Sequence, residues 1–570
     1  MNEQGKLLLA IFLSLLIILG FQYLFEAPKM KEAAEKQKVS ESDSFAPQNN
    51  LDNLENNKKE YMNLDSALNE DKRILIQTEK LKGSISLKGI KFDHLILKDY
   101  KESLDQESNY ISILKPPNTK GGYFSNFGWI TSSNNIDMPD DQTIWSSDSK
   151  ILNANSTIKL EWENPQNVKF IQEISIDENY MFTIKQTVQN NSVNSINLNS
   201  VAKISRNETP KTLGFFILHE GPLGVVNDVL EELDYKELRK NVSPKEYTSK
   251  GGWFGITDKY WLISIIPDQK SNVKARYQFY KKNNREKYQI DFMTNRIEVP
   301  SMQTSTITNY LYAGAKEVKL LDNYEEKYEI SRFDLAIDFG WFYFLTKPFF
   351  YLLIFFNNFF GNFGLSIIFV TLLIKLVFYP LANKSYISTQ RMKDLQPEMM
   401  RIRETHKNDK MKMNQEVMAL YKREKVNPAA GCLPLLIQIP VFFALYKVLF
   451  VSIEMRHAPF YLWVNDLSAA DPTSILNLFG LLPYDPNFLP KFLNIGLWPI
   501  LMGLTMWAQQ ELNPKPADPM QQKIFMFLPI FFTFILAPFP AGLVLYWTIN
   551  NILSMAQQLM IRNRLRKNNK

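Results

Sequence analysis

The sequence predicts a multidomain membrane protein with an all-α helical core and a large all-β domain. Three observations support this fold class. The mean hydropathy of the 570 residues is slightly polar at −0.21, although long apolar runs occur, so the average must combine a polar part with a membrane part. Short runs with period-two alternation of apolar and polar residues fill residues 73–325. Several apolar runs of about bilayer length follow residue 362.

The amino-terminal region predicts a membrane anchor and a tether. Residues 7–25 form an apolar run that ends in bulky residues and Pro28, whereas a cleaved signal ends in small residues. We therefore expect residues 1–27 to be a retained transmembrane helix. Residues 28–72 are rich in Lys, Glu, Asn, Ser and Gln, and their low apolar content predicts a flexible tether.

Residues 73–325 predict a β-sandwich. Alternating runs at 84–87, 157–162 and 182–188 are typical of half-buried strands. The strands do not alternate with helical patterns, which favours a sandwich over a parallel α/β sheet. The run GGWFG at 251–255 predicts a turn with a packed aromatic residue that leads into a strand at 260–266; a sugar site is the alternative interpretation.

Residues 326–362 predict an amphipathic helix that lies along the bilayer surface. Aromatic residues are dense at 339–360, which is typical of the membrane–water boundary, and Pro348 suits the first turn of a helix. A further transmembrane span is the alternative, and Asn357 and Asn358 argue against it.

Residues 363–561 predict a core of five spans, so that the chain has six with the anchor. Each apolar run is near the length that crosses the hydrocarbon. The runs are residues 363–381, 432–451, 493–511, 523–539 and 541–560. Cys432, the one cysteine, is expected to be a small buried residue, and a single thiol excludes an internal disulfide.

Basic residues predict the orientation of these spans. Residues 382–430 contain eleven Lys or Arg and the tail 562–570 contains five, whereas residues 452–492 contain two. By the positive-inside rule the first two segments are cytoplasmic and the third is outside. Both termini are then cytoplasmic and the β-domain is exported. The net charge of +6 is too small for a chain of 570 residues to indicate nucleic-acid binding.

The cytoplasmic segment 382–428 predicts a helical hairpin. Apolar residues recur at three- and four-residue spacing on both sides of Asn408 and Asp409, and Pro397 should kink or restart the first helix. Methionines suit adaptable binding of apolar segments, but the same seam could pack only on itself. The seam residues are Met392, Leu395, Met399 and Ile402 on the first helix and Met413, Val417 and Leu420 on the second.

Lys375 is the most informative single residue. It lies in the apolar run 363–381, where an ammonium costs about 2.5–3.5 kcal/mol on insertion scales. The functional interpretation is a polar site shared with Thr371, which lies one turn away on the same face. The alternative is that the long side chain reaches the headgroups. Tyr546 and Asn550 share a second helix face, and Gln438 is expected to hydrogen-bond between helices.

Four runs in order resemble the YidC/Oxa/Alb insertase family, in its Gram-negative type with a large periplasmic domain. They are NFGLSIIFVTLLIKLVFYPLANKSYISTQRMKDLQPEM (362–399), KVNPAAGCLPLLIQIPVFFALYKVLF (425–450), APFYLWVNDLSAADP (458–472) and DPMQQKIFMFLPIFFTFILAPFPAGLVLYW (518–547).

The resemblance implies a non-enzymatic insertase and chaperone of the bacterial inner membrane. Nascent inner-membrane proteins would pass through a hydrophilic groove open to the cytoplasm and to lipid, with and without the Sec translocon. The groove would hold Lys375, where many relatives carry arginine, together with Thr371, Tyr546 and Trp547; some relatives have tyrosine in place of Trp547. Implied partners are nascent membrane proteins, a translocon of the SecYEG and SecDF type, the ribosome or signal-recognition pathway, and membrane lipids. No cofactor or metal is expected.

Two other classes of function remain open from the residues. A secondary transporter or channel would also carry a charge within the membrane, but the spans contain few acidic residues and no detectable inverted repeat. A membrane-anchored enzyme acting on sugars or peptidoglycan would use the β-domain, in which no convincing pair of catalytic carboxylates is found.

Overall fold

The computed structural model describes residues 61–132, 136–213, 218–240, 243–282, 285–407, 409–426, 433–484, 486, 493–513 and 519–568. The predicted anchor, most of the predicted tether and Cys432 lie outside the described residues. All structural statements below concern the described part of the chain.

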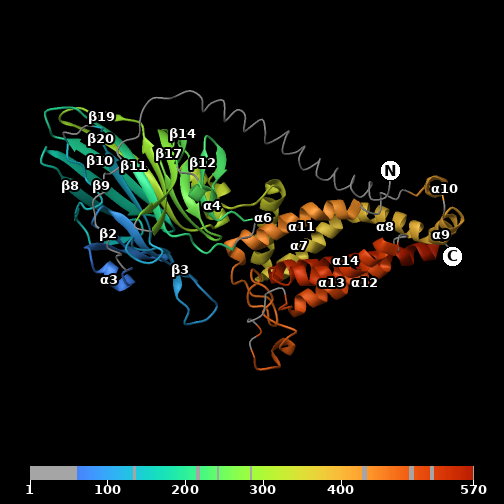
Figure 1. Ribbon diagram of the computed structural model, residues 1–570. Coiled ribbons are helices and arrows are strands. Elements are labelled where there is room, and N and C mark those ends of the chain that lie inside the picture. The colour runs from blue at the N-terminus through green and yellow to red at the C-terminus, as the bar shows by residue number, and fades with distance from the viewer. Residues whose placement is uncertain are drawn as a thin grey trace. The chain divides into compact units, whose positions relative to one another are not determined.

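The predicted β-sandwich is confirmed: two large sheets, antiparallel except for one parallel pair of strands in the first sheet, face each other (Figure 1). Phe92 of one sheet packs edge to face on Phe182 of the other, with ring centroids 5.3 Å apart, so the core lies between the sheets. The first sheet has the order β14 (Lys245–Lys250), β17 (Asn272–Lys282), β18 (Arg285–Thr294), β11 (Ile196–Asn207), β5 (Tyr123–Ile130), β3 (Lys91–Lys101), β2 (Leu81–Ser86), β1 (Arg73–Gln77) and β7 (Ile151–Asn153), with β4 (Tyr110–Leu114) on β3 and β19 (Ile297–Val299) on β11.

The second sheet completes the sandwich. Its order is β13 (Val229–Glu232), β12 (Gly221–Val226), β15 (Trp253–Thr257), β16 (Trp261–Ile266), β20 (Gln303–Ala315), β10 (Met181–Asn190), β9 (Val168–Ile176), β8 (Thr157–Glu163) and β6 (Ser146–Ser147). The short helices α3 (Leu64–Leu68) and α4 (Tyr235–Lys240) accompany the two sheets.

The run at 251–255 is only partly a turn. Gly251 and Gly252 have φ of 61° and 87°, which favours glycine, but β15 already begins at Trp253. The Trp253 ring is fully buried and lies 5.5 Å from the ring of Phe333, edge to face. The glycines predicted a turn over the whole run. Because the Trp253 ring is buried in the core, the second half of the run belongs to a strand instead.

The remaining chain is mainly helical, and each of the five runs that predicted spans is helical over most of its length. The helices are α5 (Val318–Lys327), α6 (Tyr343–Phe360), α7 (Phe363–Val377), α8 (Tyr379–Asp394), α9 (Gln396–Thr405), α10 (Lys410–Arg423), α11 (Leu433–Val451), α12 (Leu497–Leu512), α13 (Pro519–Leu536) and α14 (Ala541–Asn568), with 3-10 turns η2 (Phe333–Ala336), η4 (Ile453–Met455) and η5 (Leu478–Gly480) (Figure 1). Among the described residues, no helix taken singly has the length and apolarity of a span; α7 and α8 meet that test only as a pair, bent by 68°.

The helix predicted within residues 326–362 is confirmed as α6, but it begins earlier than Pro348 indicated. Pro348 lies inside it rather than in its first turn. The start at Tyr343 is stabilised by Lys347, whose ammonium lies 2.8 Å from Asp322 and 2.9 Å from Asp334. Large aromatic side chains on one helical face are exposed, namely Phe344, Tyr351, Phe355 and Phe359.

The segment predicted as a two-helix hairpin contains three helices. The restart at Pro397 is confirmed, because α8 ends at Asp394 and Pro397 occupies the first turn of α9. Asp409 caps α10 by accepting hydrogen bonds from the backbone of Met411 and Lys412. Tyr421 of α10 donates to the sulfur of Met399 in α9, 3.1 Å away, so part of the seam packs on itself. Three other methionines, Met400, Met411 and Met418, are exposed.

The predicted tail 562–570 is not a separate element. Helix α14 continues to Asn568, so the first seven of these residues extend the last helix. Arg and Lys are good helix formers, and no proline or glycine follows Gly542 to end the helix.

Glu454 in η4 carries a pH-dependent contact. One carboxylate oxygen accepts from the backbone N–H of Val318, 3.2 Å away, and the other is buried without a partner among the described residues. Burial raises the pKa of the Glu454 carboxyl from 4.5 to about 7. The charged form is therefore destabilising in the folded state: this penalty is absent below pH 4.5, grows as the pH rises toward 7 and is complete above it.

We expect Glu454→Gln to raise the free energy of unfolding by up to about 3 kcal/mol at pH 8 and to leave it nearly unchanged at pH 4.5. Denaturant unfolding of the full-length protein at both pH values measures the difference. Glu326→Gln, at an exposed position on α5, is the matched control and should change the free energy of unfolding little at either pH. An equal effect of Glu454→Gln at both pH values would contradict the assignment.

Candidate functional site

Lys375 lies in the last turn of α7 and contacts α14. Its ammonium donates to the Ser554 hydroxyl, 2.9 Å away, and that hydroxyl donates to the backbone oxygen of Asn550, 2.7 Å away. A serine hydroxyl is neutral, so this contact satisfies one N–H of the ammonium and leaves its positive charge uncancelled. The lysine is thereby held in place while its charge remains available to another partner.

A cavity of about 40 Å³ adjoins Lys375. Its walls come from α7, α8 and α11, and they include the polar side chains of Tyr386 and Gln438. A volume of this size holds about one water molecule, and the polar groups give such a water hydrogen-bond partners. The ammonium therefore adjoins a small cavity that has two further polar side chains in a mostly apolar wall. The apolar lining residues are Ile374, Phe378, Leu381, Ala382 and Val441.

Gln438 connects this cavity to Tyr546. Its side-chain amide donates to the hydroxyl of Tyr546, which confirms the predicted hydrogen bond between helices, here α11 and α14. The same side chain lines the cavity beside Lys375. Tyr546 itself is buried. The structure thus brings two of the predicted groove residues, Lys375 and Tyr546, near the same glutamine.

Thr371 and Trp547 occupy different surroundings from Lys375. The Thr371 hydroxyl is buried and donates to the backbone oxygen of Ile367 in its own helix, 2.6 Å away. The Trp547 ring packs on Phe442 and Phe532, with centroids 4.8 Å and 5.5 Å away. Neither residue lines the small cavity. Their contact with a passenger chain stays a prediction.

Two residues of the site were missed by sequence reasoning. Ser554 follows Tyr546 and Asn550 at a spacing of four residues each, so the helical period could have placed it on the same face. Tyr386 falls in the segment interpreted as cytoplasmic hairpin. It lies beside Lys375 because the chain bends between α7 and α8, and the sequence does not indicate the angle of that bend.

Comparisons with known proteins cover the whole chain. Residues 355–568 match a family model described as 60Kd inner membrane protein, and residues 73–352 match one described as YidC periplasmic domain. The chain is 47% identical over 560 residues to the membrane protein insertase YidC of Rickettsia felis, covering 98% of this chain and 99% of that one. It is 48% identical over 572 residues to that of Rickettsia bellii, covering 99% and 100%.

A solved structure is also similar. It is described as an active YidC insertase with the first transmembrane domain resolved, and it shares 17% sequence identity with a TM-score of 0.35. The match covers 85% of this chain and 92% of that one.

Proposed function

The chain belongs to the YidC family of membrane protein insertases, and we propose that it inserts and folds nascent inner-membrane proteins through a polar groove beside Lys375. The observation that carries the proposal is the ammonium of Lys375, which lies in an otherwise apolar helix beside a small cavity with two further polar side chains and has no acidic partner among the described residues. The groove is proposed to open to the cytoplasm and to lipid, and to work with and without the Sec translocon.

The physical task is to move a polar tail across hydrocarbon. Unpaired backbone groups and charges are expensive there, because no water is present to bind them. A wet cavity part of the way across shortens the apolar distance that the tail must cross. Lys375 offers acidic residues of the tail a transient partner, and no covalent step or cofactor is required. Burial of the new apolar segment in lipid provides the driving force.

Exposed apolar faces provide a route into lipid. Helices α12 and α13 present large side chains outward, including Leu504, Trp507, Ile530 and Phe531. Such faces suit contact with acyl chains rather than water. The exposed methionines of α9 and α10 are flexible enough to bind apolar segments of different shape before they reach the groove.

The topology belongs to the same proposal. The YidC family comprises inner-membrane proteins with a periplasmic domain. We assign six spans to the chain, with both termini cytoplasmic, the sandwich periplasmic and α6 on the bilayer surface. The exposed aromatic face of α6 and the basic residues of α8 to α10 support this arrangement. Nascent membrane proteins are the proposed substrates; translocon, ribosome and lipids are proposed partners.

Photo-crosslinking tests the groove directly. Benzoylphenylalanine in place of Phe378 puts the probe in the cavity wall and keeps Lys375 intact. A stalled nascent chain with an acidic tail should crosslink to this probe in vesicles that contain the full-length protein. The matched control replaces Phe359, which is exposed on α6 outside the cavity lining. Absence of crosslinks at 378, or equal yields at the two positions, would reject a passage beside Lys375.

A further inference from the structure

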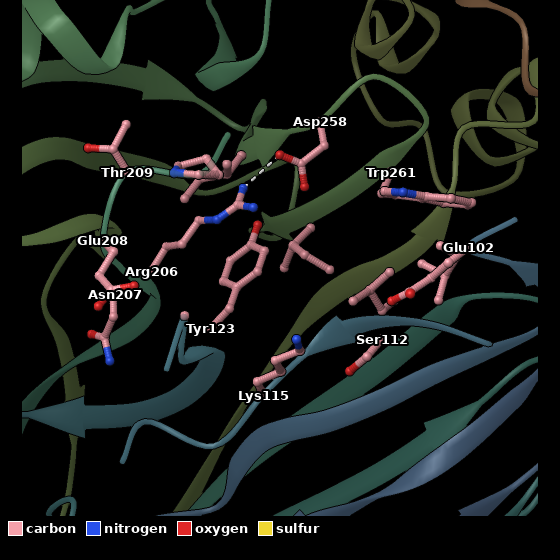
Figure 2. A pocket seen from close by; sticks show the side chains of 16 residues that line it. Glu102, Ser112, Lys115, Tyr123, Arg206, Asn207, Glu208, Thr209, Asp258 and Trp261 are labelled. Atoms are coloured by element: carbon pink, nitrogen blue, oxygen red, sulfur yellow. Dashed lines mark hydrogen bonds and ion pairs between the residues drawn. The ribbon is translucent and has the colours of Figure 1, made fainter. Parts of the chain in front are cut away.

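A second, larger cavity lies in the β-domain. It has a volume of about 330 Å³ and is bounded by β4, β5 and the end of β11 from the first sheet, and by β15 and β16 from the second (Figure 2). This volume falls within the range of small-molecule sites in proteins. None of its lining residues belongs to the groove beside Lys375.

Arg206 dominates the polar wall of this cavity. Its Nη1 donates to Asp258 at 2.8 Å and to the Tyr235 hydroxyl at 3.3 Å, and its guanidinium stacks over the ring of Tyr123 at 4.7 Å (Figure 2). These hydrogen bonds to described residues both leave from Nη1, so the donors on Nε and Nη2 remain for another acceptor. Because Asp258 neutralises the guanidinium, the wall offers these donors without a net positive charge.

Two buried polar atoms at this cavity have no hydrogen-bond partner among the described residues. One is the hydroxyl of Tyr123, a residue only 6% exposed, and the other is the side-chain oxygen of Asn207. Solvent reaches neither atom, so a ligand in the cavity cannot hydrogen-bond to them. Its polar contacts fall instead to the remaining donors of Arg206 and to the carboxylates of Glu102 and Glu208.

The opposite side of the cavity carries an aromatic surface. Trp261 lies there across from Arg206, with Glu102 and Ser112 beside it (Figure 2), and four isoleucines also line the cavity. A flat aromatic surface favours a ligand that has an apolar face as well as polar groups. The isoleucines are Ile111, Ile113, Ile256 and Ile263.

We propose that this cavity binds a neutral sugar of one or two rings. Sugar hydroxyls both donate and accept, and the C–H faces of the ring pack on Trp261. Three carboxylates and two cations line the cavity, and Arg206 is already paired, so an anionic ligand meets more negative than positive charge. The compact volume accommodates rings better than an extended polypeptide, which needs about 3.3 Å of length for each residue.

Calorimetric titration of the full-length protein tests the proposal. The protein is placed in phospholipid nanodiscs, because alkyl glycoside detergents carry sugar headgroups. Maltose, cellobiose, lactose and trehalose are the probes, and we expect at least one to bind with a Kd of about 1 mM or lower. Failure of all four to bind with a Kd below about 10 mM would overturn the proposal. Binding of the capped peptide acetyl-Ser-Thr-Ser-Thr-amide in place of the sugars would also overturn it.

Two variants link binding to the cavity. Trp261→Leu should weaken sugar binding by about five- to tenfold, because it removes the flat aromatic surface on which the sugar ring packs. Tyr277→Phe is the control for a general loss of stability. Its buried hydroxyl donates to the backbone oxygen of Leu223 at 3.1 Å, so this variant should lose stability and keep its sugar affinity. Unchanged affinity in Trp261→Leu would reject the site, and neither outcome bears on insertion through the groove.

Discussion

Replacing Lys375 with glutamate should reduce the insertion of small membrane proteins with acidic tails by more than about tenfold, which corresponds to about 1.4 kcal/mol of lost interaction. The ammonium is the charged group at the 40 Å³ cavity. A carboxylate in its place would repel acidic residues of the passenger instead of attracting them. It would also accept a hydrogen bond from Ser554 rather than donate one. The measurement is the protease-protected fraction of a newly made single-span protein in cells depleted of the wild-type insertase.

Two further variants test whether the charge at position 375 itself is required. Lys375→Arg keeps the charge and should retain most insertion, because transient attraction does not need a particular donor geometry. Lys384→Glu makes the same charge reversal at an exposed position of α8 and should insert almost as well as the wild type. Normal insertion by Lys375→Glu, or an equal loss in Lys384→Glu, would contradict a role of this cavity.

Replacing Gly83 with alanine should destabilise the sandwich by about 3 kcal/mol or more. Gly83 lies in β2, and β3 runs beside it with no room for a side chain. A Cβ at this position would overlap the backbone oxygen of His94 and would lie 2.9 Å from its carbonyl carbon and 3.1 Å from the Cα of Leu95. These are backbone atoms, so relief requires that two paired strands separate. Hydrogen exchange of the β2 and β3 amides, followed by mass spectrometry, measures the loss.

Gly128→Ala is the matched control in the same sheet. Its new Cβ would meet only a methyl group of Val201 at 3.9 Å, which is ordinary contact. Alanine also restricts the unfolded chain more than glycine, so the variant should be as stable as the wild type or slightly more stable. Similar exchange rates in the Gly83 and Gly128 variants would show that β2 and β3 can separate at little cost.

Sequence patterns predicted the β-sandwich and the helical region because they depend on local periodicity. Alternating runs located strands of the sandwich, and apolar runs located α7, α11, α12, α13 and α14. Lys375 could be identified as a site candidate because a charge within an apolar run is expensive wherever the helix packs. The early start of α6 could not be predicted, since it depends on Lys347 meeting Asp322 and Asp334 in space.

Contacts between distant segments account for what the sequence did not reveal. Gln438 reaches Tyr546 across more than a hundred residues, and no spacing rule connects them. The sugar site proposed in the sandwich depends on Tyr123, Arg206 and Trp261, which come from three strands of two sheets. Sequence reasoning examined a possible sugar site at 251–255 instead, where the structure has a turn and a buried strand.

The bend between α7 and α8 has an electrostatic consequence for Lys375. Pro380 lacks an N–H, and α7 ends at Val377, two residues beyond the lysine. Peptide dipoles of α7 therefore sum to a partial negative charge near the ammonium, and the partial positive charge at the start of α8, at Tyr379, opposes it. Because the two helix axes differ in direction by 68°, the dipoles on the two sides of the break are not aligned. Lys375 thus lies where two opposed helix ends meet, and an unbroken helix would have neither of them there.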